Sequence, residues 1–334
     1  MGTQIAPLIS AEEISLQKLS GKILAVDAFN WLYQFLSIIR GVDGEPLKDS
    51  KGRITSHLSG VFYRGVNLLE AGIKLIYVFD GKPPEFKAEE QERRRRSKQE
   101  AALEFEKAKE AGDLKAMRKY AMRTVHLDEE MIEGAKELLL AMGIAVVQAP
   151  SEGEALCSQM VKNKDAWAIA TQDYDALLFG SPRIVRNLSI SGRRKYGKGD
   201  FVLVNPELLE LQKVLKELDI NIEQLRVIGL LVGTDYNPKG IRGIGPKKAL
   251  DLVKKKKIDE IFREVEWSFE YSAEDIMDFF RNPPEGKYKI EFPGLDAGKI
   301  RKILCDRHEF SEERVNNALK RLKEKESGGL KRFA

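Results

Sequence analysis

The sequence is poor in cysteine and has no long uninterrupted apolar run. Its two cysteines, Cys157 and Cys305, lie far apart and form no C-x-x-C pair, so neither a disulfide framework nor a thiolate zinc site is indicated. No stretch approaches the roughly 18 apolar residues that a membrane-spanning helix needs. The N-terminus has no basic region followed by an apolar segment. We therefore expect a soluble protein of the cytoplasm that does not bind a membrane.

The chain is long enough and apolar enough to bury a sizeable core. Its 334 residues are 43% hydrophobic, which allows one large domain or two ordinary ones. The net charge is only +4, but the charges are unevenly spread, with twelve Lys or Arg against eight Asp or Glu between Lys87 and His126. Local fields matter more than the net charge when the partner is a polyanion.

Four short apolar runs rich in Ile, Val and Ala have the pattern of buried parallel strands, because they show no polar alternation. They are residues 22–26, 74–79, 145–148 and 166–171. Between them, apolar residues at three- and four-residue spacing predict helices over residues 29–39, 57–71 and 128–142. The alternation predicts an α/β fold with a mostly parallel central sheet flanked by helices.

Three segments depart from this alternation. Residues 83–125 are highly charged and helix-prone, which predicts a helical insertion standing off the core. A second helical region is predicted over residues 205–263, interrupted at 240–246 by a glycine-rich hairpin with Pro246 at the first position of the next helix. The polar end, residues 323–334, is expected to be a flexible tail.

Acidic residues follow each of the four predicted strands. They are Asp27, Asp80, Glu152 with Glu154, and Asp173 with Asp175; Asp235 is a seventh candidate. Ligands of open α/β sheets bind beyond the carboxyl ends of the strands, where these acids would converge. So many carboxylates would repel one another unless cations lay among them, and oxygen ligands favour Mg²⁺ or Mn²⁺ over Zn²⁺.

Each acid also has a purely structural interpretation. Ser151 and Glu154 have the spacing of a capping box, Asp27 and Asp173 could each cap the helix that follows, and Asp80 begins an ordinary Asp-Gly turn. An acid after every strand is difficult to explain by such roles alone. The interpretation as a metal site is therefore favoured, and a pair of ions is the usual arrangement for phosphodiester cleavage.

Five motifs resemble the flap endonuclease 1 family of archaea and eukaryotes. They are ILAVDA at 23–28, YVFDGKPP at 77–84, APSEGEA at 149–155, TQDYDA at 171–176 and GIRGIGPKKA at 240–249. The match runs in order from Met1 to about Leu322. The resemblance implies the PIN-like 5′-nuclease fold, as a single monomeric nuclease domain over residues 1–322, with a helical arch at about 84–127 and a helix–hairpin–helix at about 222–262.

The resemblance implies a structure-specific endonuclease that removes 5′ flaps from branched DNA by two-metal hydrolysis. An associated 5′–3′ exonuclease activity and a role in DNA replication and repair are implied with it. A related nuclease, either a 5′ exonuclease or a junction resolvase, would share the metal site. A DNA-binding scaffold with a dead site and a magnesium-dependent phosphatase are further alternatives. The full set of acids disfavours the scaffold with a dead site. A phosphatase would need neither the predicted arch nor the hairpin.

By resemblance, the seven acids hold two Mg²⁺ ions, for which Mn²⁺ could substitute, and Lys87 and Arg94 contact the scissile phosphate. The sequence supports the last assignment, because these two residues are seven positions apart on a predicted helix and share a face. Tyr33 matches a tyrosine that stacks on an unpaired base near the cut. It also belongs to an apolar helical stripe with Phe29 and Leu32, so a core role is an equal alternative.

The remaining implied residues bind DNA or a protein partner. The hairpin would grip duplex phosphates and a K⁺ ion through Gly243, Gly245, Lys247 and Lys248. A pocket for a one-nucleotide 3′ flap would be formed by Arg40, Leu47, Thr55 and Arg314. The family's C-terminal peptide for the sliding clamp survives only in part, with Leu330 and Phe333 retained but Ser327 and Ala334 in place of its Gln and second aromatic residue. We therefore expect weak clamp binding.

Overall fold

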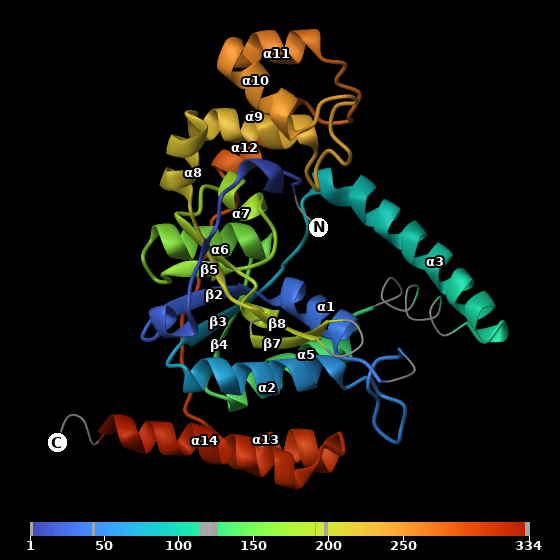
Figure 1. The fold of residues 1–334 in the computed structure, drawn as a ribbon, viewed down its shortest axis with the longest axis vertical. Coiled ribbons are helices and arrows are strands. Elements are labelled where there is room, and N and C mark those ends of the chain that lie inside the picture. Colours follow the sequence, from blue (N-terminus) through green and yellow to red (C-terminus); the bar gives the residue numbers. More distant parts are fainter. Residues whose placement is uncertain are drawn as a thin grey trace.

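The computed structural model describes residues 3–41, 44–113, 116, 120, 126–190, 192–196 and 200–330 (Figure 1). Within these ranges, only the backbone is described for residues 86, 88–91, 94, 193–196, 200–203 and 325–330. Across the described ranges, no helix combines the length and apolar character required to span a membrane.

A seven-stranded sheet lies at the centre of the fold (Figure 1). Its strands are β1 (Glu12–Glu13), β2 (Ile23–Asp27), β3 (Lys74–Phe79), β4 (Ala145–Gln148), β5 (Ala168–Ala170), β6 (Arg183–Arg186) and β9 (Glu207–Glu210). Their spatial order is β1-β9-β6-β5-β2-β3-β4. Strands β4, β3, β2, β5 and β6 are parallel. At one edge β9 pairs antiparallel with β6, and β1 pairs antiparallel with β9. The predicted α/β fold with a mostly parallel sheet is confirmed.

Helices cover both faces of the sheet and bury one hydrophobic cluster on each side. Along β2, Leu24 and Val26 belong to one cluster and Ala25 to the other, since successive side chains of a strand point to opposite faces. The helices of one cluster are α1 (Ala28–Ile38), α2 (Ser56–Glu70), α5 (Glu129–Ala141), α13 (Ala297–Arg301) and α14 (Glu312–Leu330), of which α13 and α14 pack on α5 and α2. Those of the other are α6 (Gly153–Lys162), α7 (Asp175–Leu178), α8 (Leu211–Leu218), α9 (Ile222–Val232), α10 (Pro246–Lys255), α11 (Ile258–Glu264) and α12 (Ala273–Arg281), of which α10 packs on α9 and α11 on α10.

Helix α3 (Ala88–Glu110) projects away from this body, as Figure 1 shows. It follows a short 3₁₀ turn, η3 (Glu85–Lys87), and contains the arginine-rich part of the charged insertion. The rest of the predicted arch includes residues 114, 115, 117–119 and 121–125, which lie outside the described residues. Because α3 is polar on nearly all sides, it has no apolar stripe with which to pack on the sheet.

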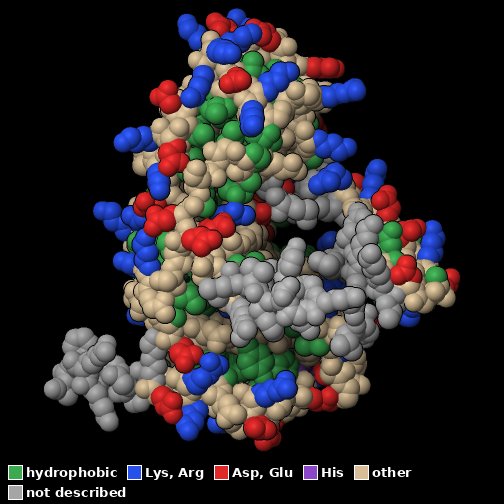
Figure 2. All heavy atoms as spheres, in the orientation of Figure 1, with side chains coloured by type: hydrophobic (Ala, Val, Ile, Leu, Met, Phe, Trp, Pro, Cys, Tyr) green, Lys and Arg blue, Asp and Glu red, His purple; other side chains and the backbone are tan. Residues whose placement is uncertain are grey.

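The glycine-rich hairpin joins α9 to α10 by a close backbone approach. Gly240 has a φ of 58°, and a Cβ there would lie 2.4 Å from the carbonyl oxygen of Leu231. Only glycine fits such a position without displacing the backbone. Helix α10 begins at Pro246 with Gly245 as its N-cap residue, as the sequence predicts. In Figure 2, Lys and Arg side chains cover α10 and α11 at one end of the molecule, interspersed with acidic ones.

The long helical region predicted from residue 205 is partly wrong. Residues Glu207–Glu210 form β9, and a two-stranded ribbon of β7 (Gly192–Tyr196) and β8 (Asp200–Val204) precedes it. Leu and Glu are good helix formers, but pairing with β6 and burial of Leu208 and Leu209 outweigh that local preference. At the other end, α14 continues to Leu330, and residues 331–334 lie outside the described part of the chain.

Candidate active site

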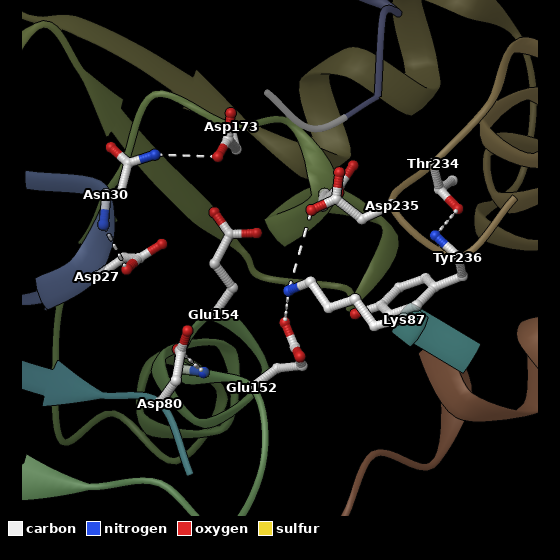
Figure 3. Close-up of polar contacts among 12 residues, drawn as sticks. Asp27, Asn30, Asp80, Lys87, Glu152, Glu154, Asp173, Thr234, Asp235 and Tyr236 are labelled. Carbon is white, nitrogen blue, oxygen red and sulfur yellow. Dashed lines mark hydrogen bonds and ion pairs between the residues drawn. The ribbon is translucent and has the colours of Figure 1, made fainter. Parts of the chain in front are cut away.

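Acidic side chains from several elements face a common space at the carboxyl edge of the parallel strands (Figure 3). Asp27 ends β2, Asp80 follows β3, and Glu152 and Glu154 lie at the start of α6 after β4. Asp173 and Asp175 follow β5, and Asp235 lies in the loop after α9. The structure thus brings together the acids that the sequence proposes as one cluster.

Asn30 connects the carboxylates of Asp27 and Asp173. Its backbone N–H donates to Asp27 Oδ1 at 3.0 Å, and its side-chain Nδ2 donates to Asp173 Oδ2 at 2.9 Å. Asp27 therefore does cap α1, as its structural interpretation requires, while also facing the cluster. Asp173 does not cap a helix, because Tyr174 is the N-cap residue of α7. A capping role and a place in the cluster are compatible for Asp27.

Asp80 ties the loop after β3 to the start of α6. Its Oδ1 accepts a 2.7 Å hydrogen bond from the N–H of Gly153, a donor at a helix N-terminus that has no partner within the helix. The next residue, Gly81, donates through its N–H to the carbonyl of Ser151 at 2.6 Å. The loops that carry Asp80 and Glu152 are therefore joined directly to each other.

Glu154 does not form the capping box that its spacing from Ser151 allows. Helix α6 begins after Glu152 and has no side-chain cap. Glu154 instead accepts a 2.8 Å hydrogen bond from the hydroxyl of Thr171 at the end of the β5 region. Its side chain points into the cluster (Figure 3), which favours the functional interpretation over the local one.

A rigid turn presents Asp235. The N–H and the hydroxyl of Thr234 both donate to Asn237 Oδ1, at 3.1 and 2.7 Å. The side-chain amide of Asn237 donates to the carbonyl of Leu230, and the N–H of Tyr236 donates to the Thr234 hydroxyl. These bonds fix the backbone on both sides of Asp235. Thr234 and Asn237 have no role in the sequence-based prediction, because nothing in the local pattern identifies the turn.

Lys87 is a basic side chain within this cluster. Its Nζ lies 2.5 Å from Glu152 Oε2 and 3.9 Å from Asp235 Oδ2 (Figure 3). Burial alone would lower the pKa of Lys87, but the charges of Glu152, Asp235 and Asp80 outweigh it and raise the pKa above its usual value. Lys87 is therefore expected to be charged at the edge of the acidic site at neutral pH.

Burial and mutual repulsion disfavour the charged form of the inner acids. Burial first, and then the charge of Asp80, raises the pKa of Asp27 to about 8. Burial and the charge of Asp235 raise the pKa of Asp175 to about 7, and burial with Asp173 raises that of Glu154 well above its ordinary value. A divalent cation would relieve this repulsion and favour the ionised acids.

The donor set fits a hard divalent cation. All the candidate ligands are carboxylates, which suit Mg²⁺ or Mn²⁺. Among the described residues, no group of three or more His, Cys, Asp or Glu side chains is already arranged so that it could hold an ion. Side-chain rotations would therefore have to close the site around a cation.

Two other predicted site residues lie on α1 and α3. Tyr33 is half-buried and packs against the core, and Lys98 Nζ of α3 lies 5.1 Å from the centre of its ring. The ring therefore contacts both the core and the charged helix, so the two interpretations of Tyr33 are not exclusive. Arg94 lies on α3 within the turns between Lys87 and Lys98, but its side chain is outside the described part of the structure.

The residues proposed for a 3′-flap pocket lie in two segments that meet. Arg40 donates to the carbonyl of Gly44 at 2.8 Å and, like Leu47 and the buried Thr55, belongs to the loop between α1 and α2. Several contacts join this loop to the segment before α14. Among them, Ser50 N–H donates to Glu309 Oε2 at 2.7 Å, and His308 Nδ1 lies 3.4 Å from Asp49 Oδ2. Arg314 follows in the first turns of α14.

Comparison with known proteins assigns this fold and site to a class of nucleases. The XPG N-terminal domain matches residues 2–101, and the XPG I-region matches residues 143–235. The two matched regions contain all seven acids of the cluster. The class is that of the XPG-type 5′ nucleases, which confirms the nuclease interpretation and excludes the phosphatase alternative.

The chain is also similar to individual members of this class along nearly its whole length. Flap endonuclease 1 of Thermococcus onnurineus is 54% identical over 331 residues, covering 98% of this chain and 96% of the relative. Flap endonuclease 1 of Pyrococcus abyssi is 53% identical over 325 residues, covering 97% and 94%. The solved flap endonuclease-1 of Methanococcus jannaschii is 40% identical, with a TM-score of 0.75 over 96% of this chain and 98% of that one.

The chain belongs to the flap endonuclease 1 family. Its activity is the metal-dependent hydrolysis of DNA that removes 5′ flaps in replication and repair. The family is magnesium-dependent, and DNA is its substrate. The archaeal resemblance, the activity and the fold predicted from the motifs are thereby confirmed, and the 5′ exonuclease and junction resolvase alternatives are set aside.

Proposed function

We propose that Asp27, Asp80, Glu152, Glu154, Asp173, Asp175 and Asp235 hold two Mg²⁺ ions, which Mn²⁺ can replace. The observation that carries this proposal is the convergence of carboxylates, several of them buried and with raised pKa values, beside the cation of Lys87 (Figure 3). Such a site favours protons or cations, and a pair of bound ions would activate water and stabilise the leaving oxygen of a phosphodiester.

The basic residues at the start of the arch act on the scissile phosphate. Lys87 is held between Glu152 and Asp235, so a phosphate entering the site meets a fixed positive charge. Arg94 lies seven residues further on, in α3. Both residues stabilise the negative charge that develops on the phosphate oxygens. Tyr33, beneath Lys98, stacks on an unpaired base next to the cut.

The helix–hairpin–helix at about residues 222–262 holds the duplex. Its turn exposes Gly243 and Gly245, and Lys247 and Lys248 are exposed in the first turn of α10. The free N–H groups of a helix N-terminus and nearby lysines suit phosphates and carry no sequence preference. We assign the K⁺ site of the family to this hairpin, because the carbonyls of a tight turn are oxygen ligands.

Further residues recognise the branched form of the DNA substrate. Arg40, Leu47, Thr55 and Arg314 form the pocket for a one-nucleotide 3′ flap, which is supported by the contacts between their two segments. A 5′ single strand passes the arch at about residues 84–127. Residues 1–322 work as one monomeric nuclease domain, which also degrades 5′ ends by 5′–3′ exonuclease action.

The C-terminal tail, residues 323–334, binds the sliding clamp weakly. Leu330 ends α14, and its side chain and the whole of Phe333 lie outside the described residues. The support for this contact is the register of the aliphatic and aromatic residues in the sequence.

The proposed mechanism is tested by single-turnover cleavage of a DNA panel with increasing Mg²⁺ or Mn²⁺. A 5′-flap substrate with a one-nucleotide 3′ flap should react faster than gapped or four-way DNA, and the rate should rise with more than first-order dependence on the metal. A first-order dependence at all concentrations would argue against two required ions. Equal rates on flap and four-way DNA would argue against the 3′-flap pocket.

A further inference from the structure

The N-terminal segment reaches a carboxylate inside the acidic cluster. Thr3 is 2% exposed, and its backbone N–H donates a 2.7 Å hydrogen bond to Asp175 Oδ1. The hydroxyl of Thr3 donates a second hydrogen bond to the same oxygen. The two residues are 172 positions apart, so this pairing is made by the tertiary fold and by no local turn.

Both hydrogen bonds end on one oxygen of the carboxylate. Neither engages Asp175 Oδ2, so the two donors fix the rotation of the group while leaving that oxygen for another partner. Metal-binding carboxylates are commonly oriented by such outer hydrogen bonds, and loss of one typically weakens metal binding by roughly 10- to 100-fold.

The segment that carries Thr3 is itself firmly held. Ile5 is fully buried in the cluster on the α6 side of the sheet, and the short helix η1 (Ala6–Leu8) packs against α10. Thr3 therefore does not approach Asp175 as a loose end. The same short segment connects the acidic cluster to the helix that follows the glycine-rich hairpin.

We propose that Thr3 is a positioning residue for Asp175, whose hydroxyl orients the carboxylate toward a divalent cation. The proposal rests on the assignment of Asp175 as a metal ligand. It adds to the seven acids a neutral side chain that acts through one of them, Asp175. It also makes the first residues of the chain part of the metal site.

The test uses the full chain without DNA, titrated with Mn²⁺ alone in a calorimeter. Thr3→Val keeps the shape and the backbone donor but removes the hydroxyl, so Mn²⁺ affinity should fall about tenfold. Thr3→Ser keeps the hydroxyl and should bind Mn²⁺ within about twofold of the wild type. The metal-free unfolding midpoints of the two variants, measured in parallel, should agree with each other.

Several outcomes would overturn the proposal. Unchanged affinity in Thr3→Val does so, as does an equal loss of affinity in Thr3→Ser and Thr3→Val. If Thr3→Val does not fold, Thr3→Ala measured against Thr3→Ser gives the same comparison of hydroxyl absent and present.

A third variant separates this inference from the assignment of the metal ligands. Asp175→Asn should lose Mn²⁺ affinity more severely than Thr3→Val. If Asp175→Asn binds Mn²⁺ as the wild type does, Asp175 is not a ligand, and the proposed site fails together with the role of Thr3. If Asp175→Asn loses the metal while Thr3→Val retains it, only the role of Thr3 fails.

Discussion

Lys87 Nζ and Glu152 Oε2 lie 2.5 Å apart, so the cation at the base of the arch is paired with a proposed metal ligand. A phosphate or a metal ion entering the site must compete for this pair. We expect Lys87→Ala to slow single-turnover cleavage roughly 100- to 1000-fold, because a charge aimed at the developing negative phosphate is lost. Binding of flap DNA, measured by anisotropy, should weaken far less, because it depends on many remote phosphate contacts.

Lys82→Ala is the matched control for this variant. Lys82 is an exposed lysine in the connection between β3 and η3, five residues before Lys87, and the Lys82→Ala variant should cleave at the wild-type rate. Arg94→Ala should behave as Lys87→Ala does. Equal losses in binding and in cleavage for both variants would mean that these residues only hold the substrate.

Asp173 is hydrogen-bonded to Asn30 and faces the other acids, so its loss should affect chemistry more than folding. We expect Asp173→Asn to retain flap binding and to lose cleavage by at least about a thousandfold, since it removes charge stabilisation of the transition state. The asparagine preserves the shape, which limits the structural disturbance. Cleavage at a near wild-type rate in saturating Mg²⁺ would refute the two-metal assignment.

Lys247 and Lys248 are exposed beside the hairpin and should contribute to duplex affinity through phosphate contacts. In a plot of log affinity against log salt concentration, the double variant Lys247→Ala with Lys248→Ala should reduce the magnitude of the slope by about two, roughly one for each lost phosphate contact. A control with the same charge change is Lys213→Ala with Lys216→Ala, on the exposed side of α8. If both double variants alter the slope equally, the effect is one of net charge and the hairpin has no special role.

His57 predicts a specific pH dependence of stability. Its side chain is 2% exposed, its Nδ1 has no hydrogen-bond partner among the described residues, and burial lowers its pKa to about 4. The unfolded chain, with a histidine pKa near 6.5, binds a proton more readily than the folded one. The contribution of His57 to stability is therefore present above about pH 6.5 and is lost as the pH falls toward 4, by up to about 3 kcal/mol.

Denaturant unfolding of His57→Gln and the wild type across this pH range measures the effect. The difference in unfolding free energy between the two should shrink as the pH falls from 7 to 4. His126→Gln, which changes an exposed histidine, should remain parallel to the wild type. A constant offset for His57→Gln at every pH would show that the pKa of His57 is the same in the folded and the unfolded chain.

The C-terminal residues predict a weak but improvable contact with the sliding clamp. Loss of a buried aromatic anchor typically costs about 2 kcal/mol, or roughly thirtyfold in affinity, so Ala334→Phe should strengthen binding by about that factor. Phe333→Ala should abolish what binding the wild type has. Calorimetry of the full-length wild type and the two variants against the host clamp measures these affinities. A titration without heat of binding for all three would show that the C-terminal residues do not bind the clamp.

The sequence predicts the centre of this fold well because its strands are buried on both faces. The predicted strands at residues 74–79 and 145–148 coincide with β3 and β4, and the acids after them occupy the sheet edge where ligands bind. The strand at Glu207–Glu210 could not be predicted, because its sequence lacks the pattern of a buried strand. Its residues favour a helix locally, and only the partner strand β6 makes it a strand.

The residues that orient the acids are harder to predict than the acids themselves. Asn30 could be anticipated in part, since it stands three residues after the cap Asp27. Thr171 and Thr3 carry no such signal, because their partners Glu154 and Asp175 are distant in sequence. Acidic residues that follow strands form a pattern that can be recognised along the chain. The hydrogen bonds that orient their side chains depend on tertiary contacts, which the sequence does not show.

The close contact at Gly81 limits how the site could be redesigned. A Cβ at this position would lie 2.2 Å from the carbonyl oxygen of Ala149 and 2.7 Å from that of Pro150, so any larger residue must push the two loops apart. Asp80 and Glu152 belong to those loops, so a change in one loop would displace both side chains. An engineer seeking a different metal preference could not adjust one of these ligands by reshaping its loop without also shifting the other.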